Sequence, residues 1–257
     1  MKVTILGCGG ASGVPGISMG WGACDPSEPR NRRRRSSILV EDGETRILVD
    51  TSPDLREQLL DANIRSVDGL IYTHDHADHL HGIDDLREIN RVTRQWLPVW
   101  AAPDVLETAR ARFGYAFEPL EDIGDVVYRP LLQANPINGP FSIGSIHVVP
   151  FDQDHGYART LGLRFGNFAY STDVVEIPEE SFESLEGLDL WIIGCLVDYP
   201  HATHAHVEKA LKWIERVKPR HAILTHMGTR LDYKTLCLTL PSWVSPAYDG
   251  LVIDVFQ

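Results

Sequence analysis

The chain is poor in cysteine and has no long apolar run, and each absence excludes a class of protein. Four cysteines are scattered through 257 residues with no Cys-x-x-Cys pair, which excludes a small disulfide-stapled scaffold. No stretch approaches the roughly 18 uninterrupted apolar residues of a membrane span, and the short run at residues 1–6 lacks the long apolar region of a signal peptide. We therefore expect a soluble, cytoplasmic protein with reduced thiols.

Basic residues are also scarce. Lysine and arginine number 24 against 36 aspartates and glutamates, which gives a formal net charge of −12. An acidic protein does not attract polyanions through its overall field, so binding to an extended nucleic acid is disfavoured. The exception is a cluster of arginines, Arg30 and Arg32–Arg35. We interpret it as a solvated surface, from which one or two arginines could contact a substrate phosphate.

Apolar residues recur with both helical and strand periods along the chain. Two β-branched runs at 37–40 and 45–49 flank Asp42-Gly43, which predicts a hairpin. Residues 13–35, rich in Gly and Pro, are expected to form a long surface loop. The predicted helices are residues 54–62, 85–92, 104–112 and 207–217, and further strands are residues 69–72, 146–151, 189–193, 221–224 and 251–256. This order predicts one sheet-rich α/β domain over residues 1–257.

The most informative segment is a cluster of possible metal ligands at residues 74–79. His74, His76, Asp78 and His79 lie within six residues, directly after the apolar run 70–73. Packing does not explain such a density of polar side chains at a strand end. Imidazole and carboxylate groups suit Zn, Mn, Fe or Ni, so this segment predicts a metal site.

Three more possible ligands follow strand-like runs later in the chain. They are His155, Asp173 and His226. Loops at the carboxyl ends of strands converge on one crevice in α/β folds, so these side chains are expected to meet the first cluster. A single carboxylate, Asp173, could bridge two ions about 3.5–4 Å apart. We interpret His147, His201, His206 and His221 as ordinary surface or core residues.

With these residues identified, the sequence resembles the metallo-β-lactamase-fold hydrolases, whose signature His-x-His-x-Asp-His stands at residues 74–79. The resemblance covers nearly the whole chain and implies a four-layer αβ/βα sandwich with a dimetal site at its edge. It also implies that Asp50 orients the histidine loop from outside the ligand set. By the same resemblance, His74, His76 and His155 hold one ion, Asp78, His79 and His226 hold the other, and Asp173 bridges the two.

Details of the sequence narrow the branch of this family. True β-lactamases commonly carry cysteine where Asp173 stands, and residues 200–210 look like the loop and helix that bear an extra histidine in phosphodiesterase members, best matched by His204. These members are tRNA 3′-processing endonucleases and phosphoribosyl cyclic phosphate phosphodiesterases. Residues 6–15 and Tyr248-Asp249-Gly250 look like the second group. That group often has a cysteine-rich structural zinc site, but Cys24 alone cannot close one, so none is expected here.

The leading hypothesis is a dimetal phosphodiesterase that cleaves a small (cyclic) phosphodiester, such as a ribosyl cyclic phosphate or a nucleotide-like ester. A metal-bridging hydroxide would attack phosphorus, with two divalent ions, Mn or Zn, neutralising the phosphoryl oxygens. His204 and Asp78 are the predicted catalytic residues, and Ser12 and His204 the predicted substrate contacts. The partner is a small phosphate ester, and a homodimer is possible from the family.

Three alternatives remain open. A tRNA 3′-processing endonuclease is disfavoured because His155 and Asp173 are only 18 positions apart, too few for an RNA-gripping arm. A thioester hydrolase of the glyoxalase II type would leave residues 200–206 without a role. A non-catalytic nucleotide- or metal-binding module is disfavoured by the complete ligand set. The glycine cluster at residues 7–13 resembles a dinucleotide-binding loop, but Pro15 and Gly16 follow it where that motif needs a helix.

Overall fold

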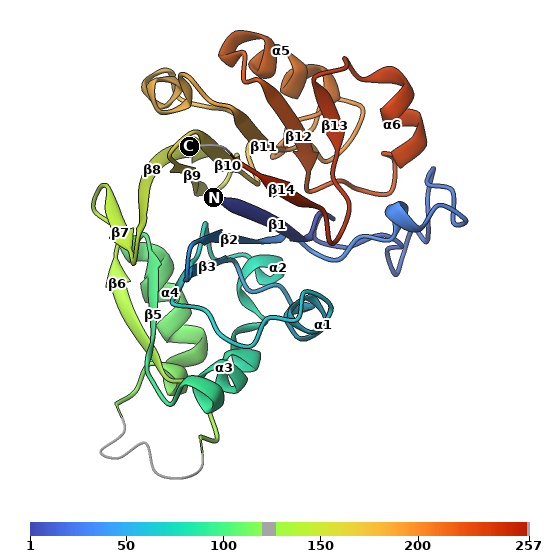
Figure 1. Ribbon diagram of the computed structural model, residues 1–257. Helices are drawn as coiled ribbons and strands as arrows, with labels where there is room; N and C mark the ends of the chain where they lie inside the picture. The colour runs from blue at the N-terminus through green and yellow to red at the C-terminus, as the bar shows by residue number, and fades with distance from the viewer. Residues whose placement is uncertain (120–126, 256–257) are drawn as a thin grey trace.

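Two seven-stranded sheets pack face to face in this protein (Figure 1). The computed structural model describes residues 1–119 and 127–255. The first sheet has the strand order β14-β1-β2-β3-β4-β5-β6, and the second has the order β13-β12-β11-β10-β9-β8-β7. The outer strand β14 comes from the C-terminal end of the chain and pairs with β1, so the two ends of the described chain lie side by side.

The first sheet is covered by helices on its outer face. Its strands are β1 (Lys2–Gly7), β2 (Ser37–Asp42), β3 (Thr45–Val49), β4 (Gly69–Ile71), β5 (Leu97–Ala101), β6 (Leu132–Pro136) and β14 (Val252–Asp254). The helices of this half are α1 (Leu55–Asp61), α2 (Ala77–Leu80), α3 (Leu86–Thr93) and α4 (Pro103–Phe113).

The second sheet carries the remaining helices. Its strands are β7 (Phe141–Ile143), β8 (Ile146–Asp154), β9 (Arg159–Phe165), β10 (Phe168–Ser171), β11 (Leu190–Gly194), β12 (His221–Thr225) and β13 (Val244–Pro246). Helices α5 (Val207–Val217) and α6 (Tyr233–Thr239) pack on this sheet. Short 3-10 helices at Pro29–Asn31, Ile83–Asp85, Gly114–Ala116 and Glu179–Leu185 complete the described elements.

Alternation along the inner strands explains why the molecule has four layers. In β2, Ile38 and Val40 face the core between the two sheets, whereas Leu39 faces the helices of the first half. Residues on successive positions of a strand point to opposite faces, so a strand covered on both sides must be apolar throughout. The fold class predicted from the sequence, an α/β sandwich, is confirmed.

Most predicted elements occur with small shifts at their ends. The hairpin at Asp42-Gly43 is confirmed, with β2 and β3 antiparallel and Asp42 opposite Thr45. The four predicted helices all form, and the helix at residues 207–217 has the predicted bounds. The last strand is shorter than predicted, ending at Asp254, and Phe256 lies outside the described residues. Residues 13–35 form the expected loop, interrupted by one 3-10 helix.

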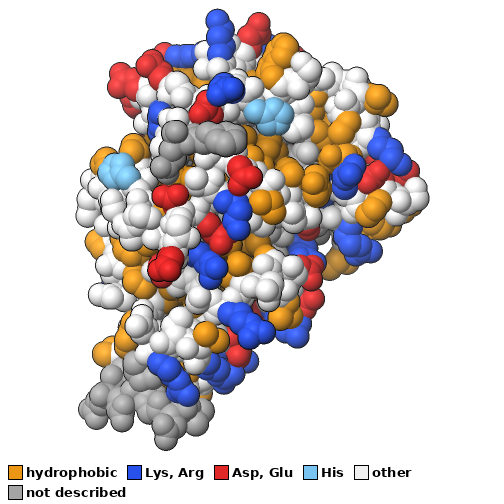
Figure 2. Space-filling view, in the orientation of Figure 1, with side chains coloured by type: hydrophobic (Ala, Val, Ile, Leu, Met, Phe, Trp, Pro, Cys, Tyr) orange, Lys and Arg blue, Asp and Glu red, His pale blue; other side chains and the backbone are white. Residues whose placement is uncertain are grey.

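The surface is mixed in character. Acidic and basic side chains are interspersed over the face seen in Figure 2. Among residues 1–119 and 127–255, no helix combines the length and the apolar character needed to cross a bilayer.

The arginine cluster is only partly solvated, which corrects the sequence interpretation. Arg30 and Arg32 are exposed, but Arg33 is 2% exposed and its guanidinium donates to Leu231 O at 2.6 Å, Gly228 O at 3.2 Å and Asn31 Oδ1 at 3.2 Å. The interpretation of this cluster as a solvated surface is therefore wrong for Arg33. This side chain ties the loop to residues 228–231, which follow the candidate ligand His226.

Replacing Arg33 with alanine is expected to lower the free energy of unfolding by about 3 kcal/mol. The loss arises because three acceptors, two of them in buried hydrogen bonds, lose their donor and the side chain leaves a void. Urea unfolding would measure it. The neighbouring exposed Arg32→Ala is the matched control, with an expected cost within about 1 kcal/mol. Equal losses in the two variants would contradict a structural role for the buried guanidinium.

Candidate metal centre

The histidine loop begins where β4 ends. Tyr72 and Thr73 continue from β4, His74 and His76 occupy a tight loop, and α2 starts at Ala77. The ring centroids of His74 and His76 are 4.6 Å apart, and those of His74 and His79 are 4.3 Å apart. A loop followed at once by a helical turn therefore gathers three rings from six residues, as the sequence cluster predicted.

The second sheet contributes three side chains from the ends of its strands. His155 follows β8, Asp173 comes two residues after β10, and His226 follows β12. Asp173 and His226 have positive φ angles of 46° and 55°, and so does Asp50 after β3, at 63°. Residues other than glycine adopt this left-handed conformation at a cost of about 1–3 kcal/mol, and such strain concentrates at functional sites. The sharp turn after each strand marks this edge of the sandwich as a candidate site.

The structure brings these side chains into three overlapping groups of potential ligands. Within each group the ligand atoms lie within 4.8 Å of one another. The groups are His74, His76 and His155; Asp78, His79, Asp173 and His226; and His155, Asp173 and His204. All seven residues predicted as ligands are included, together with His204.

Asp173 lies between the groups, and its two oxygens face different neighbours. Oδ2 is 2.9 Å from His79 Nε2 and 3.2 Å from His226 Nε2. Oδ1 is 3.0 Å from His204 Nε2 and 3.6 Å from His155 Nε2. One carboxylate thus reaches two clusters, which is the geometry that a bridging ligand requires.

Asp50 supports the histidine loop from behind. Its buried carboxylate accepts hydrogen bonds from His79 Nδ1 at 2.7 Å, from Thr73 N at 2.8 Å and from Thr73 Oγ1 at 2.8 Å. Because the proton of His79 is held on Nδ1, the lone pair of Nε2 faces the cluster and can bind a metal ion. Thr203 does the same for another ring, because its carbonyl accepts from His155 Nδ1 at 2.6 Å. Sequence reasoning missed Thr203, whose backbone role leaves no side-chain signal.

His74, His155 and Asp173 are in the ionisation states that bind cations. Burial lowers the pKa of His74 well below its usual value, and it lowers the pKa of His155 to about 4, so both rings are neutral at pH 7. Burial works to raise the pKa of Asp173, but the charges of His226 and His79 outweigh it and hold the pKa well below its usual value. Neutral imidazoles beside an ionised carboxylate match the ligand preference of borderline divalent ions.

Buried charge and unpaired nitrogens show that a cation fits here. Burial opposes a charge on His79, yet Asp173, Asp78 and Asp50 raise the pKa of this ring well above its usual value. Nε2 of His74 is buried with no hydrogen-bond partner among the described residues. Nε2 of His79 likewise lacks a partner with hydrogen-bond geometry, although it lies close to Asp173. Buried polar atoms without partners are costly, and a divalent cation would satisfy them.

The two predicted substrate contacts lie in different surroundings. His204 belongs to the cluster: its Nδ1 is 2.8 Å from Thr203 Oγ1, and its ring stacks on His226 with centroids 5.1 Å apart. Burial lowers the pKa of His204. Ser12 instead lines an arginine-rich pocket whose lining includes none of the seven predicted ligands, and its hydroxyl donates to Gly13 O at 3.2 Å. The structure thus brings His204, but not Ser12, into contact with the predicted ligands.

Comparison with known proteins places this arrangement in a family. The model of the beta-lactamase superfamily domain matches residues 45–227. The octanoyltransferase of Porphyromonas gingivalis is 33% identical over 99% of this chain and 52% of its own length. A ribonuclease Z of a Bradyrhizobium species is 39% identical over 30% of this chain and 26% of its own length. The chain thus spans about half, or less, of the curated relatives that it matches.

Solved structures extend the comparison. The crystal structure of a new diphosphatase from the PhnP family superposes with a TM-score of 0.90 and 31% identity, covering 99% of this chain and 98% of that one. The short form of human tRNase Z superposes with a TM-score of 0.70 over the whole of both chains, at 16% identity, which shows a shared fold alone. This chain belongs to the beta-lactamase superfamily, among the hydrolases of the metallo-β-lactamase fold.

Proposed function

We propose that the protein is a two-metal phosphodiesterase that hydrolyses a small phosphate ester, such as a ribosyl cyclic phosphate or a nucleotide-like diester. The observation that carries this proposal is the position of Asp173. Its Oδ2 lies within 3.2 Å of His79 and His226, while its Oδ1 lies within 3.6 Å of His204 and His155. A carboxylate shared in this way supports two ions rather than one.

The predicted ligands divide between the two positions. His74, His76 and His155 would hold one ion, Asp78, His79 and His226 the other, and Asp173 both. Two divalent ions, Mn or Zn, supply Lewis-acid stabilisation of phosphoryl charge and an activated water when bound. The chain's own residues orient this centre: Asp50 fixes the ring of His79, and the Thr203 carbonyl fixes that of His155.

His204 has the position of a proton donor. Its Nε2 is 3.0 Å from Asp173 Oδ1, and its Nδ1 is 2.8 Å from Thr203 Oγ1. The ring therefore stands beside the predicted ligands, anchored on one side by a hydroxyl. A hydrogen bond or proton delivered from Nε2 to the leaving oxygen would lower the barrier to its departure.

A second candidate reaction is hydrolysis of a diphosphate bond. It is favoured by the resemblance to the PhnP-family diphosphatase, at 31% identity over nearly the whole of both chains. The same centre suits this reaction, because a phosphoric anhydride places the same kind of charge on the phosphoryl oxygens. The two reactions differ in the leaving group, which is an alkoxide in one and a phosphate in the other.

The endonuclease alternative has weaker support. His155 and Asp173 are joined by β9 and β10, which form a plain antiparallel hairpin without an inserted arm. The similarity to human tRNase Z stands at 16% identity. A small substrate is also consistent with the −12 net charge.

An assay panel would test the proposal. The purified protein, loaded with Mn or Zn, is expected to hydrolyse bis(p-nitrophenyl) phosphate together with a ribosyl cyclic phosphate or ADP-ribose. A chelator should abolish that turnover, and readdition of metal should restore it. Turnover of ADP-ribose without the diesters would favour the diphosphatase reaction. Cleavage of a 3′-extended tRNA at low enzyme concentration, or hydrolysis of a glutathione thioester alone, would overturn the proposal.

A further inference from the structure

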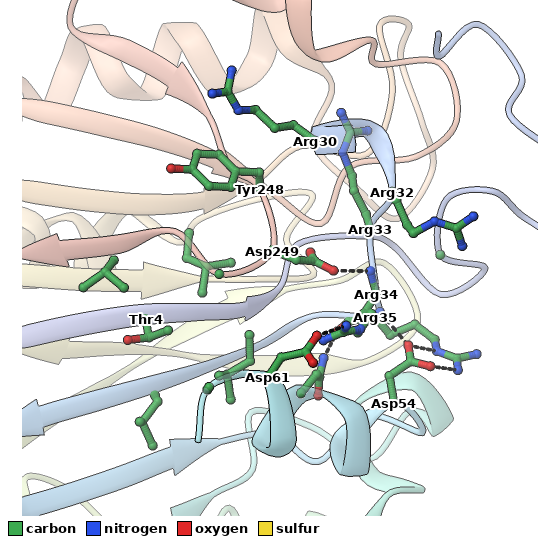
Figure 3. A pocket seen from close by; sticks show the side chains of 18 of the residues that line it. Thr4, Arg30, Arg32, Arg33, Arg34, Arg35, Asp54, Asp61, Tyr248 and Asp249 are labelled. Carbon is green, nitrogen blue, oxygen red and sulfur yellow. Dashed lines mark hydrogen bonds and ion pairs between the residues drawn. The ribbon is translucent and has the colours of Figure 1, made fainter. Parts of the chain in front are cut away.

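A large open pocket lies on the first sheet, lined by residues other than the predicted ligands. Its volume is about 1140 Å³, and it runs from β1 and β2 past α1 to the arginine segment 29–35 (Figure 3). Its lining includes seven cationic residues, Lys2, Arg30, Arg32, Arg33, Arg34, Arg35 and Arg46, and four acidic ones, Glu41, Asp54, Asp61 and Asp249. Three positive charges are thus in excess here, in a chain whose net charge is −12.

Several of these cationic side chains are already bound to carboxylates or backbone carbonyls of the protein. Arg34 forms an ion pair with Asp61, and Arg35 binds Asp54 through Nε at 2.8 Å and Nη2 at 2.6 Å. Arg33 is buried against backbone carbonyls. Further along the pocket, a single carboxylate is shared by two cations: Glu41 lies 2.7 Å from Lys2 and 3.1 Å from Arg46.

Arg30 and Arg32 are different. Neither forms an ion pair with any residue of the described chain. Instead, the guanidinium of Arg30 lies over the rings of Tyr233 and Tyr248, at 5.0 Å and 5.3 Å from their centroids, and that of Arg32 lies 5.4 Å from the centroid of Trp21. A guanidinium stacked through its face keeps its N–H edge available for a bidentate anion.

The segment that carries these arginines is held rigidly. The Arg34 N–H donates to Asp249 Oδ2 at 2.7 Å (Figure 3). The other oxygen of this carboxylate, Asp249 Oδ1, accepts from Cys8 N at 3.1 Å. Asn31, between the two stacked arginines, donates to Asp232 at 2.7 Å. Donors fixed before a ligand arrives lose less conformational entropy on binding. In Figure 3, Arg30 extends toward Tyr248 and Arg32 extends the other way, so their free edges are well separated.

We propose that this pocket is a second anion-binding site, apart from the metal centre, which binds a ligand carrying several phosphate groups. Planar guanidinium edges match phosphate oxygens, and two separated edges with an excess of positive charge favour an extended polyanion over a single small anion. Such phosphates occur both in free polyphosphates and in the backbone of a short RNA. In an RNA ligand, bases beside these phosphates would meet the half-buried rings of Trp21, Tyr233 and Tyr248 where the arginines leave them uncovered.

Calorimetric titration of the metal-loaded protein tests the proposal. The two probes are inorganic tripolyphosphate and a 2′-O-methyl tetraribonucleotide, which resists hydrolysis. The double variant Arg30→Gln/Arg32→Gln is expected to bind the better probe about tenfold more weakly than the wild type. The matched control Arg87→Gln/Arg220→Gln removes two exposed arginines elsewhere, each paired with a carboxylate, and is expected to retain affinity within about twofold.

The separation from the metal centre has its own readout. Turnover of bis(p-nitrophenyl) phosphate and its inhibition by orthophosphate are expected to be the same in the wild type and in Arg30→Gln/Arg32→Gln. Preference for tripolyphosphate would assign the site to free polyphosphates, and preference for the oligonucleotide to RNA. Unchanged affinity in the double variant, an equal loss in the control, or a parallel loss of turnover would each overturn the proposal.

Discussion

Asp173→Asn is expected to lower turnover of bis(p-nitrophenyl) phosphate about 1000-fold and to reduce the bound metal from about two ions per chain to one or fewer. The amide keeps the size of the side chain but removes its negative charge and offers only one oxygen. The carboxylate now lies 2.9 Å from His79 through one oxygen and 3.0 Å from His204 through the other. If either oxygen loses its contact, the side chain no longer links the two ligand groups.

Metal analysis of the purified variant, in parallel with the assay, would measure both effects. Asp152→Asn is the matched control, because Asp152 is partly exposed, pairs with Arg159 and belongs to none of the three ligand groups. It should keep the metal content and the turnover of the wild type. An Asp173→Asn protein that retained two ions and most of its activity would remove the bridging role from the proposed mechanism.

His204→Ala is expected to retain the metal while losing turnover by about 100- to 1000-fold, the range typical for a single acid–base group. The His204 ring takes no part in the hydrogen bonds that hold the rings of His79 and His155. Its removal therefore leaves the Asp50–His79 and Thr203–His155 hydrogen bonds in place. The loss should fall mainly on kcat. It should also be smaller for substrates with good leaving groups, which need less protonation.

His201→Ala provides the comparison for this variant. The two rings are neighbours, with centroids 5.2 Å apart, but His201 contacts Thr203 rather than Asp173. It is expected to keep turnover within a few fold. Unaltered turnover in His204→Ala would exclude His204 from the reaction, and a loss of metal instead would reassign it as a ligand, in line with its place beside His155 and Asp173.

Much of the candidate site could be predicted from the sequence because its residues follow a local rule. Each of His74, His155, Asp173 and His226 comes within two residues of the end of a strand or strand-like run, and apolar runs are legible without knowledge of the fold. The hairpin at Asp42-Gly43 and the amphipathic helix α5 were equally local. The convergence of these strand ends needed only the general tendency of α/β loops to share one edge.

What the sequence did not reveal depends on contacts between distant residues. The burial of Arg33 is set by carbonyls at Gly228 and Leu231, almost 200 positions away. The support that Thr203 gives to His155 comes from a backbone carbonyl 48 positions along the chain. Strand β5 was missed because Pro98 interrupts a short run, and it forms as a strand between two parallel neighbours, β4 and β6. Tertiary pairing overrides local preference in such segments.

The division of the candidate ligands between the two sheets has a mechanical consequence. His74, His76, Asp78 and His79 belong to the edge of one sheet, and His155, Asp173 and His226 to the edge of the other. If one sheet shifted relative to the other, the distances between the ligands of the two sheets would change. Activity is therefore expected to depend on how the two sheets are aligned. Trp191 is buried in the core between the sheets, and its indole donates to Ser171 Oγ at 3.0 Å, two residues before Asp173. Substitutions in the core between the two sheets are therefore expected to lower activity without changing any ligand.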